Sequence, residues 1–135
     1  MCSEAERVFQ FEAAAKGVEG GGEDAQLKRL GELMCASQAS CRDDYECSSE
    51  GLDALCAIAM GAEAGASGSR LTGAGWGGCC VSLVHRDRVA PFIARLRAAY
   101  GPYQGKDEAF LSVAVFASAP GSGAAVYTPP ASFDI

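Results

Sequence analysis

The chain is poor in the residues that build several common kinds of site. It has one histidine, His85, and one tryptophan, Trp76, and none of its seven cysteines forms a pair separated by two residues. Zinc sites need Cys and His ligands at characteristic spacings, so the sequence predicts no zinc site. A single His also provides no Ser/His/Asp or Cys/His catalytic set. We therefore interpret the cysteines as reduced and mostly as small core residues.

Basic residues and long apolar runs are also scarce. The chain has 11 Lys and Arg against 17 Asp and Glu, a formal net charge of -6, and a pI of about 4.7. This balance argues against nucleic acid or an anionic membrane surface as a partner. No run of about 18 apolar residues occurs, and the charged start "MCSEAERVFQ" does not resemble a signal peptide. We expect no membrane span and a cytoplasmic location.

At 135 residues the chain is expected to form one domain with a real core. Its first half is typical of helices. Residues 3–16 place apolar side chains on one stripe after a capping Ser3. Asp24 is the predicted cap of a second helix that continues toward residue 45. Ser48 or Ser49 is the predicted cap of a third helix, which ends near residue 61 or 65.

The pattern changes after residue 68. The segments "GSRLTG" (68–73) and "CCVSLVH" (79–85) are typical of strands, the second apolar enough to be central in a sheet. A helical stripe covers 89–100. "AFLSVAVFAS" (109–118) and "AAVYT" (124–128) favour two more strands joined by a turn at 120–123. The predicted fold is α+β, with helices packed on a mostly antiparallel four-stranded sheet.

Five glycines lie between residues 68 and 78, in "GSRLTGAGWGG". The run contains a G-x-G-x-x-G pattern, but a strand follows it where a dinucleotide site needs a helix. A protein-kinase glycine loop does lie between strands, and His85-Arg86-Asp87 imitates the catalytic H-R-D. That triplet lies seven residues after Gly78 and has no D-F-G partner, so we interpret it as a coincidence and His85 as a surface residue at a strand end.

Two interpretations of the glycine run stay open on the residues alone. Its N–H groups can form a concave anion site, with Ser69, Arg70 and Thr72 close in sequence. Alternatively, the glycines only permit the dihedrals of a tight hairpin, although such a turn needs only one or two of them. Trp76 either covers a ligand or pins the loop to the helices.

A second polar group of residues lies in "SCRDDYECSSE". Arg42, Asp43, Asp44 and Glu46 could hold a metal ion or a sugar. A run of this kind is more often a solvated helix end with local ion pairs, and we favour that interpretation.

Two long motifs resemble one family. "GSRLTGAGWGGCCVSLV" is similar to the third motif of the galactokinase branch of the GHMP sugar and metabolite kinases, and "LGELMCASQASCRDDYECSSEGLDAL" is similar to the segment before it. The start at residues 4–8 and the end at "FASAPGSGAAVY" also resemble that family. Trp76 and "YECS" (45–48) are similar to the eukaryotic galactokinases and N-acetylgalactosamine kinases. Cys80 stands where the family commonly has Thr.

The resemblance implies a GHMP-kinase C-terminal domain over residues 1–127, followed by a loose tail at 128–135. It implies an ATP-dependent sugar 1-kinase that needs Mg²⁺ and phosphorylates galactose or N-acetylgalactosamine. The family's sugar site, phosphate loop and catalytic Asp belong to an N-terminal domain that nothing here matches. We therefore expect a fragment or truncated product that is inactive alone, with no catalytic and no metal-binding residue. The expected ATP and phosphate loop consists of Ser69, Arg70, Thr72, Gly73, Ala74, Gly75, Trp76, Gly77 and Gly78.

Two alternatives remain beside the kinase. The same domain could serve as a non-catalytic module for sugar sensing or for a protein partner, or it could be an orphaned domain without a ligand.

Overall fold

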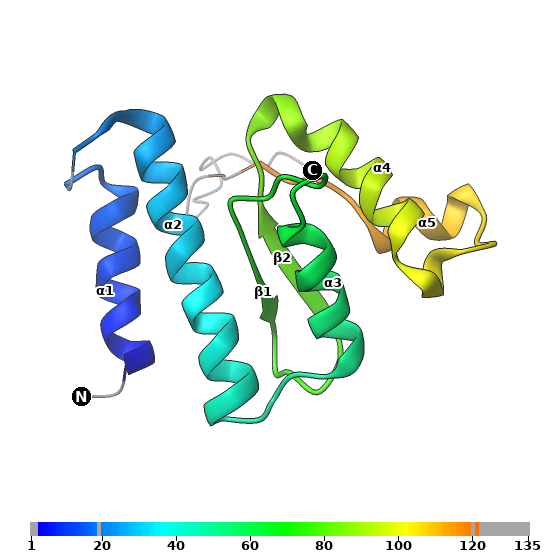
Figure 1. Ribbon diagram of the computed structural model, residues 1–135, viewed down its shortest axis with the longest axis horizontal. Helices are drawn as coiled ribbons and strands as arrows, with labels where there is room; N and C mark the ends of the chain where they lie inside the picture. The colour runs from blue at the N-terminus through cyan, green and yellow to red at the C-terminus, as the bar shows by residue number, and fades with distance from the viewer. Residues whose placement is uncertain (1–2, 19, 120, 122–135) are drawn as a thin grey trace, which may run out of the picture.

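A computed structural model describes residues 3–18, 20–119 and 121. The elements in chain order are α1 (Ser3–Ala15), α2 (Gly22–Ala39), the π-helical turn η1 (Ser40–Asp44), α3 (Glu50–Met60), β1 (Gly68–Thr72), β2 (Cys79–Leu83), the 3₁₀ turn η2 (Arg86–Arg88), α4 (Val89–Ala99), the 3₁₀ turn η3 (Gly101–Tyr103) and α5 (Glu108–Ala114). In Figure 1 the helices α1 and α2 lie side by side, and the hairpin, α3 and α4 lie on the side of α2 away from α1. The four predicted helices and the hairpin are confirmed.

The helix starts follow local capping chemistry. The Leu52 N–H donates to Ser49 Oγ at 3.4 Å, so the predicted cap of α3 is confirmed for Ser49. Asp24 is not the cap of α2, because that helix begins at Gly22, after Gly21 in a left-handed conformation with φ of 97°. Asp24 lies instead in the first turn, where its carboxylate favourably meets the positive end of the helix dipole.

The predicted four-stranded sheet is not confirmed. In the described residues the sheet has two antiparallel strands, with β1 and β2 paired from Gly68 opposite Leu83 to Thr72 opposite Cys79. The strand expected at 124–128 falls outside the described residues. β2 is not a central strand there, since Val81 is 45% exposed.

The strand predicted at 109–118 is wrong, because α5 covers residues 108–114. Asp107 caps this helix, accepting a hydrogen bond from the Phe110 N–H at 2.8 Å. Arg97 of α4 donates from Nη2 to the Leu111 carbonyl at 3.1 Å. The apolar run suggested a strand, whereas the Asp-Glu start and the neighbouring cation favour a helix.

Two helices flank the hairpin closely. α2 approaches β1 through Gly31 and Gly68, where a Cβ on Gly31 would lie 1.9 Å from the Ser67 carbonyl oxygen. Any side chain at Gly31 would therefore push the helix away from the strand. α3 packs on the face that carries Ser69 and Leu71, which are 1% and 2% exposed.

The buried residues form two clusters around α3. One joins Ala59 of α3 to Phe92 and Leu96 of α4. The other joins Leu52 of α3, Leu71 of β1 and Cys47 of the preceding loop, with Cys41 and Cys80 packed against them. The second cluster supports the glycine loop, because its member Cys47 lies against Gly75 and Trp76 of that loop.

Candidate functional site

The loop between β1 and β2 has an unusual backbone. Gly73, Gly75, Gly77 and Gly78 all have positive φ, and so does Trp76 at 54°. An L-residue such as Trp pays a steric cost in this region, so something must hold Trp76 there. The glycine run is thus used for left-handed dihedrals along nearly its whole length, which exceeds what a simple hairpin turn needs.

The loop is held by the segment that precedes α3. The Trp76 N–H donates to the Cys47 carbonyl oxygen at 2.5 Å. A Cβ on Gly75 would lie 2.3 Å from the same oxygen. Since Cys47 is only 3% exposed and packs with Leu52 and Leu71, the loop is anchored on the core.

An aromatic pair marks the outer side of this contact. The rings of Tyr45 and Trp76 have centroids 5.9 Å apart and planes tilted by 53°, within the range of favourable aromatic contacts. Both rings are exposed, Tyr45 at 69% and Trp76 at 63%. Glu46, between Tyr45 and the anchoring Cys47, is the other non-glycine residue with positive φ, 54°.

The remaining backbone of the loop is open. Among the described residues, the N–H groups of Gly73, Gly75 and Gly77 donate to no carbonyl. A Cβ on Gly73, Gly77 or Gly78 would meet nothing within 4 Å. Consecutive N–H groups in such a loop can line a concavity that accepts an anion. The loop therefore leaves these three N–H groups without a carbonyl partner among the described residues.

The three polar residues before the loop have different surroundings. Ser69 is 1% exposed, and its Oγ lies 2.9 Å from Ser82 Oγ, so this hydroxyl belongs to the core. Arg70 donates from Nε to its neighbour's carbonyl, Leu71 O, at 2.9 Å, and helps line a groove beside α1. Thr72, at the end of β1, is exposed next to the loop.

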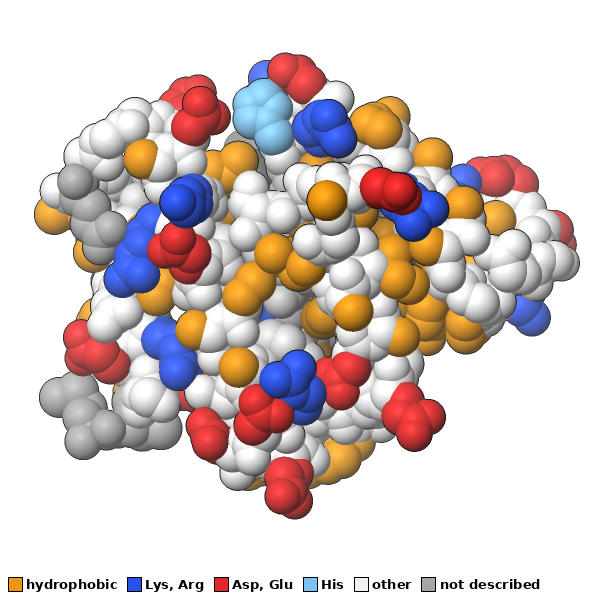
Figure 2. Space-filling model, in the orientation of Figure 1, with side chains coloured by type: hydrophobic (Ala, Val, Ile, Leu, Met, Phe, Trp, Pro, Cys, Tyr) orange, Lys and Arg blue, Asp and Glu red, His pale blue; other side chains and the backbone are white. Residues whose placement is uncertain are grey.

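Acidic side chains gather at the same end of the molecule. Figure 2 shows red side chains at the lower end, where Figure 1 places the α2–α3 connection and the hairpin loop. Asp43, Asp44 and Glu46 are exposed there. Arg42 forms an ion pair with Asp43, with Nε 2.7 Å from Oδ1, which lowers the pKa of that carboxyl and raises the pKa of Arg42. The predicted local ion pair is confirmed.

No metal centre is apparent in the part of the chain that the structure describes, where no three His, Cys, Asp or Glu side chains are grouped to hold an ion. No described helix is long and apolar enough to cross a membrane. His85 is exposed beyond the end of β2, as predicted, and its Nδ1 accepts from the Asp87 N–H at 3.4 Å.

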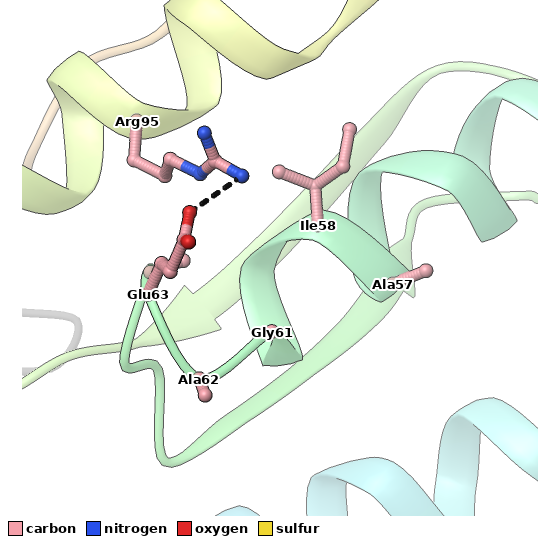
Figure 3. A pocket seen from close by; sticks show the side chains of 7 residues that line it. Ala57, Ile58, Gly61, Ala62, Glu63 and Arg95 are labelled. Carbon is pink, nitrogen blue, oxygen red and sulfur yellow. Dashed lines mark ion pairs between the residues drawn. The ribbon is translucent and has the colours of Figure 1, made fainter.

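The opposite end of the hairpin holds a separate hollow of about 380 Å³. Figure 3 shows Arg95 of α4 reaching across it to Glu63, in an ion pair with Nη2 2.7 Å from Oε2. Ile58 and Gly61, at the end of α3, also line it. No residue of the glycine loop takes part, so this hollow is not the candidate site.

The region that contains this loop matches a known protein family. Residues 23–102 match the model of the C-terminal region of GHMP kinases, which covers the two helices before the hairpin, the glycine loop and α4. This match spans more than half of the chain, so the chain belongs to the GHMP kinase family and corresponds to its C-terminal domain.

Several curated proteins that are similar to this chain are named galactokinase. One from Chloroflexus aurantiacus is 42% identical over 106 residues, 78% of this chain and 25% of its own. One from Clostridium acetobutylicum is 45% identical over 87 residues, 64% of this chain and 22% of its own. One from Saccharomyces cerevisiae is 57% identical over 58 residues, 43% of this chain and 11% of its own. The chain thus matches about a quarter or less of each relative.

Sequence reasoning missed how the site is held together. Tyr45 was not singled out as a site residue, although it pairs with Trp76, and Cys47 was counted only among core cysteines. Tyr45 and Cys47 both contact Trp76, which lies about 30 residues further along the chain, and Glu46 between them has a left-handed backbone. No local sequence pattern reveals these contacts. The one available signal was the aromatic residue within an otherwise acidic segment.

Proposed function

We propose that this chain is the C-terminal part of an ATP-dependent sugar kinase. In this proposal the complete enzyme transfers the γ-phosphoryl group of ATP to the anomeric hydroxyl of galactose or N-acetylgalactosamine. The observation that carries the proposal is the anchored glycine loop, in which the N–H groups of Gly73, Gly75 and Gly77 donate to no carbonyl among the described residues. Membership of the GHMP kinases and the similarity to galactokinases support the reaction class.

The proposed role of the loop is to form one wall of the phosphate site. Backbone N–H groups bind phosphate oxygens without reorganising, because the Cys47 contact already fixes the loop. Thr72 is placed to add a hydroxyl at the loop's start, whereas Ser69 is buried and serves the core. We therefore assign anion binding to residues 72–78 and leave the hydroxyl of Ser69 out.

Charge balance makes the loop dependent on other groups. Arg42 is paired with Asp43, Arg70 lies on the groove side of β1, and the exposed Asp44 and Glu46 lie in the segment that contacts the loop. ATP supplies the phosphoryl group to be transferred, and a bound Mg²⁺ neutralises part of its charge. Because this end of the domain is acidic, we propose that the cations, the sugar site and the catalytic base come from another part of the enzyme. The domain alone should then be inactive.

The test restores the missing part. The chain is mixed with the part of Chloroflexus aurantiacus galactokinase that lies outside the matching segment, and ATP-dependent formation of sugar phosphate is measured with galactose and with N-acetylgalactosamine. We expect no product from either piece alone and product from the mixture, and the preferred sugar assigns the substrate. Both pieces must show folded circular dichroism spectra. No product from a folded, associated mixture would refute the kinase proposal and favour a non-catalytic sugar-sensing or interaction module.

Trp76 gives a second, direct readout because it is the chain's only tryptophan. We expect ATP to change its fluorescence in the mixture and to leave it unchanged in the isolated chain. A strong change in the isolated chain would contradict the idea that the loop supplies only one wall of the site.

A further inference from the structure

Two thiols from different elements meet beside the glycine loop. Cys56 of α3 and Cys80 of β2 have their Sγ atoms 3.7 Å apart, although 24 residues separate them in the chain. Both are free cysteines in the structure, Cys56 buried and Cys80 half-buried. A disulfide has an S–S distance of about 2.05 Å, so the sulfurs need to approach by less than about 2 Å.

The surroundings of the pair favour a thiolate on Cys56. Ser69 Oγ donates to Cys56 Sγ at 3.6 Å, and the Cys80 Sγ lies 3.7 Å from the same sulfur. The contact between the two thiols lowers the pKa of Cys56 to about 7, and the same contact, with burial, raises the pKa of Cys80. The Cys56 sulfur is thus suited to react first, as a thiolate. The Cys80 thiol is then placed to react with the oxidised Cys56.

We propose that Cys56 and Cys80 form a reversible disulfide when the protein meets hydrogen peroxide, joining α3 covalently to β2. The site is an oxidative modification site and does not depend on the proposed kinase function. It lies where the strand leaves the glycine loop, since Cys80 follows Gly78 by two residues.

The chemistry balances with peroxide as the only co-reactant. The Cys56 thiolate attacks one peroxide oxygen, the O–O bond breaks, and the hydroxide that leaves takes up a proton to form water. Cys56 is then a sulfenic acid, oxidised by two electrons. Cys80 attacks the Cys56 sulfur, the S–O bond breaks, and the leaving hydroxide takes the Cys80 proton as a second water. A dithiol such as dithiothreitol reverses the link by thiol–disulfide exchange.

Cys80 also touches the cluster on which the loop stands. Its side chain packs against Cys47, Leu52 and Leu71, and its thiol lies 3.6 Å from the Leu52 carbonyl oxygen. Closing the disulfide draws β2 toward α3 at this point. The link would therefore stiffen the base of the loop, next to the Cys47 carbonyl that holds Trp76.

The test maps the link in the purified 135-residue chain. Reduced protein is treated with peroxide, remaining thiols are alkylated, and the peptides are analysed by mass spectrometry with and without dithiothreitol. We expect a Cys56–Cys80 cross-linked peptide, about 2 Da lighter than its reduced parts through loss of two hydrogens, that disappears on reduction. The thermal midpoint should rise with oxidation and return on reduction.

Matched variants separate this pair from general thiol oxidation. Cys35→Ser removes a thiol whose Sγ lies 3.7 Å from the Met60 Sδ, and this variant should still form the link and show the midpoint shift. Cys80→Ser should lose the cross-linked peptide and the shift in thermal midpoint. If that variant unfolds, Cys56→Ala provides a second test and should lose the same two signals. Absence of the Cys56–Cys80 peptide in folded protein, or a dominant link through Cys79, Cys41 or Cys47, would overturn the proposal.

Discussion

The anchoring of the glycine loop on Cys47 can be tested with one substitution, Gly75→Ala. Its new Cβ would lie 2.3 Å from the Cys47 carbonyl oxygen and 2.9 Å from the Cys47 Cβ, at a φ of 89°. The left-handed backbone alone costs an alanine about 1–2 kcal/mol. Displacing the loop also breaks the Trp76 hydrogen bond, which is worth about 0.5–1.5 kcal/mol. We expect a total loss of about 1.5–3.5 kcal/mol in the free energy of unfolding.

Gly73→Ala is the matched control because Gly73 has the same φ, 89°, and a Cβ there would meet nothing within 4 Å. It should lose only the backbone cost of about 1–2 kcal/mol. Both glycines gain the same stabilisation from a stiffer unfolded chain, so that contribution cancels between the variants. Urea unfolding followed by circular dichroism and by Trp76 fluorescence gives the two values. Equal destabilisation by both substitutions would refute the close contact.

Three further expectations concern stability. Ser49→Ala should lower the free energy of unfolding by about 0.5–2 kcal/mol through loss of the α3 cap, measured by urea unfolding; no change would argue against the cap. Leu71→Ala should cost about 2–5 kcal/mol, since Leu71 is 2% exposed, and a loss below 1 kcal/mol would contradict its burial. The pKa of Cys56, lowered to about 7, makes the unfolded chain bind more protons between about pH 7 and 9, so stability should rise across this window. Cys56→Ala should flatten that rise, and an unchanged slope would assign it to other groups.

Local sequence patterns predicted the elements that depend on local chemistry. The apolar residues at helical spacing after Ser49 and across 89–100 predicted α3 and α4, and both helices are confirmed. The strand-like segments after residue 68 predicted the hairpin of β1 and β2. The same patterns failed where apolar residues allow either structure. The run at 109–118 contains enough Val and Phe for a strand, yet Asp107 and the neighbouring Arg97 favour the helix found there.

Contacts between distant segments were beyond prediction from one sequence. The glycine run indicated a special backbone, but nothing in it showed that Cys47 would provide the anchor or Tyr45 the second ring. The cysteines were rightly expected to fill the core at Cys47 and Cys56, which are buried. Their spacing could not show that Cys56 meets Cys80, because that contact depends on how α3 packs on β2.

The most direct test of the proposed phosphate binding by residues 72–78 uses a chimera. In it, this chain replaces the matching segment of Chloroflexus aurantiacus galactokinase. Gly77→Ala is the decisive substitution, because Gly77 has a φ of 147° that an alanine rarely adopts, and an added Cβ would meet nothing within 4 Å. We predict that the chimera phosphorylates galactose and that Gly77→Ala lowers kcat/KM for ATP at least about tenfold. The strained backbone at this position should also cost about 1–3 kcal/mol of stability, so kcat/KM is measured well below the melting temperature of the variant. An unchanged kcat/KM in the folded variant would contradict the account.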